Sequence, residues 1–115
     1  MIRFRVATYN VHKCRGMDFR VNPARTLAVL QQLDSDVIAV QEVFEKQALF
    51  FAERLGVESR FAPAREFDGQ LYGNAVFSRL GLRSSAVHDL TVSGREPRNC
   101  IRVELSLDKI SEGRT

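Results

Sequence analysis

Hydrophobic and polar residues alternate at the start of the chain, and this period of two predicts a strand over residues 2–10. A polar stretch that contains Gly16 follows and reads as a loop. Apolar positions then recur at helical spacing, which predicts a helix over residues 23–33. Asn22 is a good N-cap for this helix, and Pro23 suits its first position. The first third of the chain therefore begins as a strand, a loop and a helix.

The next apolar run, residues 37–41, has the composition of a strand buried on both faces. The carboxylate of Glu42 arrives where this run stops. A second helix is predicted over residues 44–55, because its apolar residues fall on one face, and Gly56 supplies the left-handed residue that commonly ends a helix. Short strands separated by turn signals follow, at residues 59–64, 74–78, 82–89 and 99–107.

The order of these elements predicts an α/β fold with a mixed sheet. A strand, a helix and a second strand form a crossover, which places the two strands parallel, whereas the later strands follow one another as antiparallel neighbours. The carboxyl ends of parallel strands meet at one edge of a sheet, and ligand sites form there. Asn10 closes the first strand and Glu42 closes the second, so we expect both side chains at that edge.

An amide and a carboxylate without a nucleophilic Ser or Cys nearby favour a hard cation over covalent catalysis. Carboxylate, amide and water oxygens are the usual ligands of Mg²⁺, which often bridges to a substrate phosphate. A glutamate is ionised at neutral pH, and a bound Mg²⁺ would polarise a phosphoryl oxygen and orient water. The competing interpretation is that Glu42 only marks the point where a strand reaches solvent.

Composition narrows the class of protein. The 115 residues make at most one domain, and no apolar run is long enough to span a bilayer. The N-terminus alternates charged with apolar residues and does not resemble a signal peptide, so a cytoplasmic location is expected by default. Cys14 and Cys100 lack metal-site spacing and are expected to be reduced thiols, although a disulfide stays an alternative.

Positive charge is concentrated near the N-terminus. The formal net charge is +3, with 14 Arg and 3 Lys among the 17 cationic residues. Residues 3–25 hold six cations against one acid, Asp18. This cluster favours a polyanionic partner, with nucleic acid slightly preferred, or it is a solvated basic edge. The excess of Arg suits phosphate recognition, but genomic base composition explains it equally well.

Four segments together resemble a known family. "ATYNVH" (7–12), "DVIAVQEV" (36–43) and "YGNAVFSR" (72–79) are similar, in this order, to the first three signature blocks of the endonuclease/exonuclease/phosphatase family of metal-dependent phosphoesterases. "EPRNCIRVEL" (96–105) resembles the fourth block. Each block is weak alone, but four in register cover nearly the whole chain.

The resemblance implies site residues by position. Glu42 would be the ligand of Mg²⁺ or Mn²⁺, and Asn10 the active-site amide that positions the metal water or the phosphate. Asn74 would line the catalytic cleft. His12, Tyr72 and Arg98 would contact the phosphate or the substrate. Four of these residues also have a structural alternative. His12 would be a loop histidine, Tyr72 a packing residue, Asn74 a turn amide and Arg98 a solvated strand end.

The resemblance also implies that residues 1–115 form the N-terminal part of a larger domain. The family fold is a four-layer α/β/β/α sandwich, and about half of it would place helices on one face of the sheet and leave the other face uncovered. The later family blocks, Asp-x-Asn and Asp-His, are not found in this sequence, so we expect little activity from the chain alone. A missing C-terminal half or self-association would cover the open face.

Two alternatives to an enzyme stay open. In the first, the chain is a non-catalytic truncated remnant that binds nucleic acid through its basic loop. In the second, it is a small α/β domain with an unrelated binding role.

Overall fold

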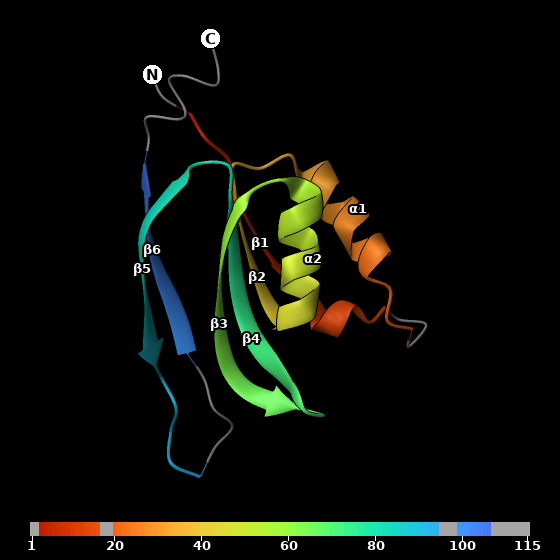
Figure 1. Ribbon diagram of the computed structural model, residues 1–115, viewed down its shortest axis with the longest axis vertical. Coiled ribbons are helices and arrows are strands. Elements are labelled where there is room, and N and C mark those ends of the chain that lie inside the picture. Colours follow the sequence, from red (N-terminus) through yellow and green to blue (C-terminus); the bar gives the residue numbers. More distant parts are fainter. Residues whose placement is uncertain (1–2, 17–19, 95–98, 107–115) are drawn as a thin grey trace.

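A computed structural model describes residues 3–16, 20–94 and 99–106 of the chain (Figure 1). Two α-helices, a short 3₁₀ turn and six strands follow one another along this part of the sequence, and every helix and strand predicted above is present. They are β1 (Val6–Asn10), η1 (His12–Cys14), α1 (Pro23–Leu33), β2 (Val37–Phe44), α2 (Glu45–Leu55), β3 (Glu58–Phe67), β4 (Gln70–Ser78), β5 (Gly81–Asp89) and β6 (Asn99–Ser106).

The strands form two sheets. In the four-stranded sheet the order is β1-β2-β4-β3, with β1 parallel to β2 and the other pairs antiparallel. The predicted mixed sheet and the parallel crossover are therefore confirmed. β5 and β6 form a separate antiparallel pair, which the sequence did not distinguish from the first sheet. β3 and β4 extend further than predicted and meet in a two-residue turn at Asp68 and Gly69, both at positive φ.

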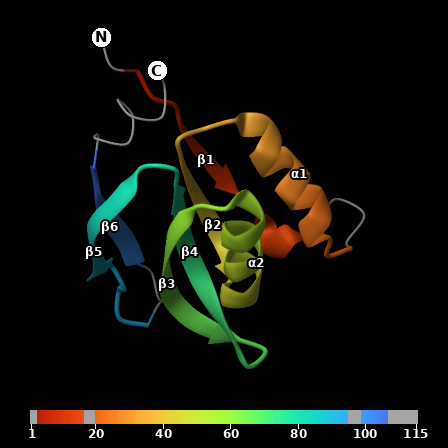
Figure 2. The same cartoon turned by 45° about the horizontal axis from the view of Figure 1, so that its top comes forward.

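Both helices cover the same face of the four-stranded sheet (Figures 1 and 2). α1 begins as predicted, since the Asn22 side chain accepts a hydrogen bond from the backbone N–H of Arg25 at 3.1 Å. α2 ends at Gly56 in the left-handed conformation, also as predicted. The core between helices and sheet consists mainly of aliphatic and aromatic side chains, including Leu30, Ile38, Val40, Val43, Phe51, Ala75 and Phe77.

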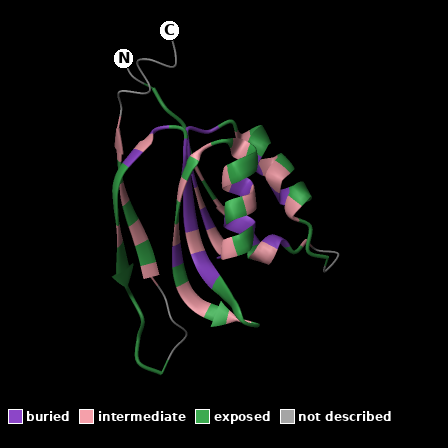
Figure 3. Cartoon of the chain, viewed as in Figure 1, coloured by how far each residue is buried: buried purple, intermediate pink, exposed green. Residues whose placement is uncertain are grey.

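The opposite face of this sheet is only partly covered. Ile101, Val103 and Leu105 of β6 pack on a small cluster that contains Val37 and Val76. Beside them Phe4, which precedes β1, is 45% exposed and Val6 of β1 is 63% exposed. Figure 3 shows the buried residues concentrated between sheet and helices, with β5 and β6 mostly intermediate or exposed. The expectation of a wholly uncovered face is therefore corrected, because the β5–β6 pair packs over β3 and β4 and reaches Val37 of β2.

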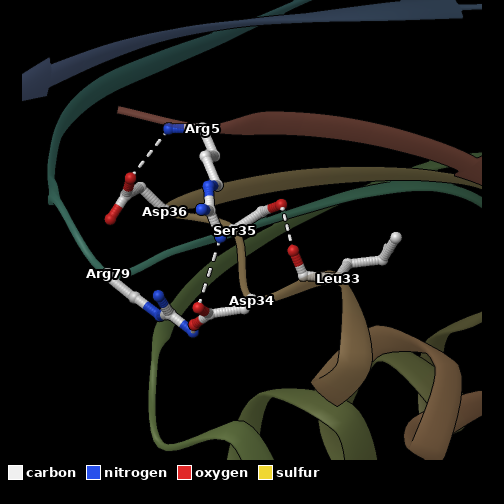
Figure 4. A network of polar contacts seen from close by, with 6 residues as sticks. All are labelled: Arg5, Leu33, Asp34, Ser35, Asp36 and Arg79. Atoms are coloured by element: carbon white, nitrogen blue, oxygen red, sulfur yellow. Dashed lines mark hydrogen bonds and ion pairs between the residues drawn. The ribbon is translucent and has the colours of Figure 1, made fainter. Parts of the chain in front are cut away.

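A polar network closes the edge of the sheet where the parallel strands begin (Figure 4). The backbone N–H of Arg5 donates to the Asp36 carboxylate at 2.8 Å. Asp34, in the left-handed conformation after α1, accepts from Arg79 at 2.8 Å and from Arg5 at 3.4 Å. The hydrogen bond and the charge of Arg79 hold the pKa of Asp34 below its usual range. This network joins the residue before β1, the residue after β4 and the segment between α1 and β2.

Asp34→Asn is expected to lower the melting temperature at neutral pH by about 1–4 °C, because asparagine tolerates the left-handed backbone but lacks the charge that pairs with Arg79. The pKa of Asp34 is depressed in the folded state, so its contribution is present above the unfolded pKa and is lost as the pH falls through the folded pKa. The melting temperatures of wild type and Asp34→Asn should therefore differ at pH 7 and become equal in acid. An equal difference at every pH would contradict this prediction.

Candidate functional site

Glu42 lies in a β-bulge and does not end its strand. β2 pairs with β4 through Val40 and again through Val43, so two residues of β2 face one residue of β4, Asn74. Glu42 has a φ of 55°, which is uncommon for a residue with a side chain. The expectation that Glu42 closes the strand is thus wrong, since β2 continues to Phe44. The bulge directs the carboxylate away from the helix-covered face.

A second bulge lies at the same level of the sheet. Gly73 of β4 pairs with Pro63 and Tyr72 pairs with Arg65, which leaves Ala64 of β3 without a partner on β4. A Cβ atom on Gly73 would overlap the carbonyl oxygen of Ala62 and lie 2.8 Å from the backbone nitrogen of Ala64. The glycine in "YGN" therefore permits the close approach of β3 at this bulge.

The Glu42 carboxylate is held through both of its oxygens. The side-chain N–H of Asn10, at the end of β1, donates to Oε2, and the hydroxyl of Tyr72 donates to Oε1 at 3.2 Å. The amide oxygen of Asn10 in turn accepts the backbone N–H of His12 at 3.1 Å. The predicted meeting of Asn10 and Glu42 at the carboxyl edge of β1 and β2 is what the geometry shows. In this arrangement the Asn10 nitrogen orients the carboxylate.

The chain after Asn10 is held in an unusual conformation. His12, Lys13 and Cys14 have φ values of 49°, 59° and 60°, so three successive residues with side chains are left-handed. With Glu42, they account for four of the six such non-glycine residues in the part of the chain that the structure describes. Backbone conformations of this kind cost free energy and occur preferentially at functional sites. The turn also brings Nδ1 of His12 to 3.5 Å from Oε2 of Glu42.

The environment favours the ionised form of Glu42. Burial raises the pKa of this carboxyl, but the hydrogen bonds from Asn10 and Tyr72 and the charges of His12 and Lys13 outweigh burial, and the pKa lies below its usual range. The side chain stays 40% exposed, so the carboxylate can still reach solvent. An ionised, oriented and accessible carboxylate is what a divalent cation requires.

An open cavity of about 540 Å³ lies beside the carboxylate. No group of three His, Cys, Asp or Glu side chains gathers anywhere in the described ranges. Mg²⁺ is nevertheless commonly held by one or two carboxylates with several waters, so a single glutamate with neighbouring amides fits this ion better than it fits Zn²⁺. The cavity is lined by Asn10, Lys13, Gln41, Glu42, Ala64, Arg65, Tyr72, Gly73, Asn74 and Asn99.

The other predicted site residues differ in their surroundings. Asn74 lines the cavity, and its amide donates to Oδ1 of Asn99 at 2.9 Å. Asn99 donates in turn to the carbonyl of Pro63 at 3.0 Å, so this pair of amides joins β4, β6 and β3. The ring of Tyr72 packs against Phe44 with centroids 5.3 Å apart and its hydroxyl contacts Glu42, while its contact with a substrate stays a prediction. Arg98 lies outside the described residues.

Two cations at the cavity were not singled out from the sequence. The ammonium of Lys13 lies 3.9 Å from the ring centroid of Phe67 and 5.3 Å from that of Tyr72. The guanidinium of Arg65 lies 5.3 Å and 5.5 Å from the same two rings. Lys13 follows Asn10 by only three residues, and this short separation could have indicated that Lys13 lies near the site. Arg65 lines the cavity next to the bulge at Ala64, and no local sequence pattern predicts this bulge.

Tyr72→Phe is expected to weaken Mg²⁺ binding severalfold, because one of the two hydrogen bonds that orient the carboxylate is lost. The ring packing is kept, so the free energy of unfolding should fall by only about 0.5–1.5 kcal/mol. Calorimetric Mg²⁺ titration and urea unfolding measure the two effects. Wild-type Mg²⁺ affinity in the variant would show that the hydroxyl does not orient Glu42.

A crossover of parallel strands, helices on one face, and a carboxylate with an amide at the carboxyl edge define an α/β protein with a polar site at the edge of its mixed sheet. The sequence model of the endonuclease/exonuclease/phosphatase family matches residues 7–109. The chain belongs to this family. A search of curated proteins gave no significant match.

Solved structures of the family share the fold. An endonuclease/exonuclease/phosphatase from Beutenbergia cavernae superposes with a TM-score of 0.80 at 22% identity, over 96% of this chain and 36% of that one. A family protein from Leptotrichia buccalis gives 0.72 at 18% identity, over 92% and 50%. A mannosyl-6-phosphatase from Bacteroides thetaiotaomicron gives 0.64 at 21% identity, over 90% and 46%.

The chain thus spans half or less of the length of these three proteins. They share with it a mixed α+β fold, of which only a part is present here. Within the described ranges, neither helix has the length and apolar character needed to cross a membrane.

Proposed function

We propose that this chain supplies the metal-binding part of a Mg²⁺-dependent phosphoesterase, with Mn²⁺ as a second suitable ion, that hydrolyses a phosphomonoester or a phosphodiester. The observation that carries the proposal is the Glu42 carboxylate, held by Asn10 and Tyr72 at the rim of an open cavity. Family membership supports phosphoester hydrolysis as the reaction class. A sealed ion pair at Glu42, or Asn10 at the far end of the sheet, would have excluded it.

The residues have separate roles in this proposal. Glu42, with Asn10 beside it, would hold the cation, and Asn10 keeps the carboxylate in one orientation. When bound, Mg²⁺ supplies a Lewis acid for a phosphoryl oxygen and orients the attacking water. Asn74 would position the substrate inside the cavity. His12, Tyr72 and Arg98 would contact its phosphate, as the family resemblance implies.

Further groups are needed for turnover. A general base and groups that stabilise the transition state each contribute on the order of 10²-fold or more, beyond the metal and phosphate binding that the residues described here would supply. The chain spans half or less of its solved relatives, so we place these groups in the remainder of the family domain. That remainder, or a second copy of the chain, would cover the exposed Phe4, which precedes β1, and Val6 of β1.

The test is an assay of hydrolysis by complementation. The chain is incubated with p-nitrophenyl phosphate and with bis-p-nitrophenyl phosphate, with and without Mg²⁺, alone and mixed with a polypeptide that continues the family domain. A Mg²⁺-dependent gain of at least about 100-fold on mixing is expected. An absence of gain in a complex that does form would contradict the proposal and favour a non-catalytic protein that binds nucleic acid through its basic loop.

A further inference from the structure

The side chain of Lys13 is fixed in place, although a lysine normally extends freely into solvent. Its ammonium lies 3.9 Å from the centroid of the Phe67 ring and 5.3 Å from that of Tyr72. Both rings come from the β3–β4 hairpin, so Lys13 reaches across from η1 to a different part of the chain. A cation over aromatic faces is attracted by their quadrupoles and held in one region.

The backbone of Lys13 is fixed as well. Its carbonyl accepts a hydrogen bond from the side chain of Gln47 at 2.8 Å, and Gln47 is buried at the start of α2. The other end of the same amide accepts the backbone N–H of Phe44 at 3.1 Å. Gln47 therefore ties η1 to the junction of β2 and α2. This tie compensates for the left-handed conformation of Lys13, which needs support from its surroundings to persist.

The ammonium keeps unused hydrogen-bonding capacity. Aromatic faces attract the charge but accept its N–H groups only weakly, and an ammonium has three N–H donors. Across the described ranges, no carboxylate forms an ion pair with Lys13, Glu42 included. Lys13 lines the same cavity as Glu42, and Arg65 adds a second positive charge over the same rings. This part of the cavity is suited to an anion.

We propose that Lys13 is a phosphate-binding residue, whose ammonium donates to an anionic oxygen of the phosphate group that enters the cavity beside Glu42. This inference rests on the proposed function for the identity of the ligand, but not for the position of the cation. It assigns the two sides of the cavity different tasks: Glu42 attracts the metal ion, and Lys13, over Phe67 and Tyr72, holds the charge of the substrate. In this role Lys13 contacts the phosphate and is a binding residue.

The alternative for Lys13 is purely structural, with the ammonium only pinning the β3–β4 hairpin to η1. The two roles predict different results for Lys13→Met. Methionine keeps an unbranched apolar stem and favourable contacts with aromatic rings but removes the charge. A structural role would change the melting temperature alone, whereas a binding role changes the affinity for phosphate.

The experiment is a titration of the intact chain with inorganic phosphate at pH 7.5, with and without Mg²⁺, followed by NMR shifts of the amides around Lys13 and Tyr72. Lys13→Met is expected to weaken phosphate binding by about 10- to 100-fold in both conditions, the usual effect of losing a charged hydrogen bond. Lys13→Arg should stay within about threefold of wild type. Lys46→Met is the matched control, because Lys46 is exposed on α2 and does not line the cavity, and it should bind phosphate normally.

Unchanged phosphate affinity in Lys13→Met, or no phosphate binding by the wild-type chain, would overturn the inference. Its failure is distinguishable from failure of the proposed function by measuring Mg²⁺ binding without phosphate. Normal Mg²⁺ binding through Glu42 with phosphate binding that ignores Lys13 would refute this inference alone. Phosphate binding that depends on Lys13, with no Mg²⁺ site at Glu42, would refute the metal part of the proposed function alone.

Discussion

Glu42→Gln is expected to lower Mg²⁺ affinity at least about 100-fold while the fold is retained. Loss of an outer partner of a metal ligand typically costs about 10- to 100-fold, and loss of the charged ligand itself should cost more. Glutamine has nearly the same shape, and its amide oxygen can still accept from Asn10 or Tyr72, so the bulge should persist. Isothermal titration calorimetry with Mg²⁺ and circular dichroism measure the two effects.

The control for this variant is Glu53→Gln, which makes the same change of charge at an exposed position on α2 and should leave Mg²⁺ binding unchanged. The pH dependence gives a second check. Because the pKa of Glu42 is depressed, its carboxylate stays ionised on going from neutral to mildly acidic solution, and wild-type affinity should fall only as the pH passes through that lowered pKa. Equal Mg²⁺ affinity in Glu42→Gln and wild type would remove Glu42 as the ligand.

Gly73→Ala is expected to destabilise the chain by at least about 2 kcal/mol, a large part of the 5–15 kcal/mol that typically stabilises a domain. The new methyl group would overlap the carbonyl oxygen of Ala62, and because this is backbone, relief requires β3 to move away from β4. That movement would also displace the bulge at Ala64 and the cavity wall next to it. Urea unfolding measures the loss of stability, and Mg²⁺ titration measures the effect on the site.

Gly81→Ala provides the comparison. A Cβ there would meet the Cβ of Ser106 at 3.4 Å and Oε2 of Glu58 at 4.0 Å, both ordinary contacts, and the residue does not have a positive φ. This variant should therefore unfold within about 0.5 kcal/mol of wild type. Similar losses in Gly73→Ala and Gly81→Ala would mean that the close approach of β3 to Gly73 is not what requires the glycine.

The sequence predicted the parts of the fold that depend on local chemistry. Alternation of polar and apolar residues predicted β1, Asn22 predicted the start of α1, and Gly56 predicted the end of α2. These features are predictable because periodicity, helix capping and left-handed helix ends each require particular residue types. The meeting of Asn10 and Glu42 was also predictable, since a parallel crossover brings the ends of two strands together whatever their separation along the chain. The family followed from the order of the blocks.

The sequence did not predict features that depend on how strands pair. β2 continues past the bulge at Glu42 to Phe44, although a charged residue after an apolar run suggests the end of a strand. Neither the separation of β5 and β6 from the first sheet nor the bulge at Ala64 has a local signal, because register is decided by partners distant in the sequence. The left-handed turn at Lys13 is likewise stabilised from outside, by the buried side chain of Gln47.

A divalent cation should bind at the carboxyl edge of β1 and β2, against Glu42. The most direct measurement is paramagnetic broadening by substoichiometric Mn²⁺ in the ¹H–¹⁵N spectrum of the chain, with Mg²⁺ added to compete. Broadening is expected around Asn10, Glu42 and Asn74, reversed by Mg²⁺ and absent in Glu42→Gln. Broadening centred on Asp34 and Asp36 at the opposite edge of the sheet, or none at all, would contradict it.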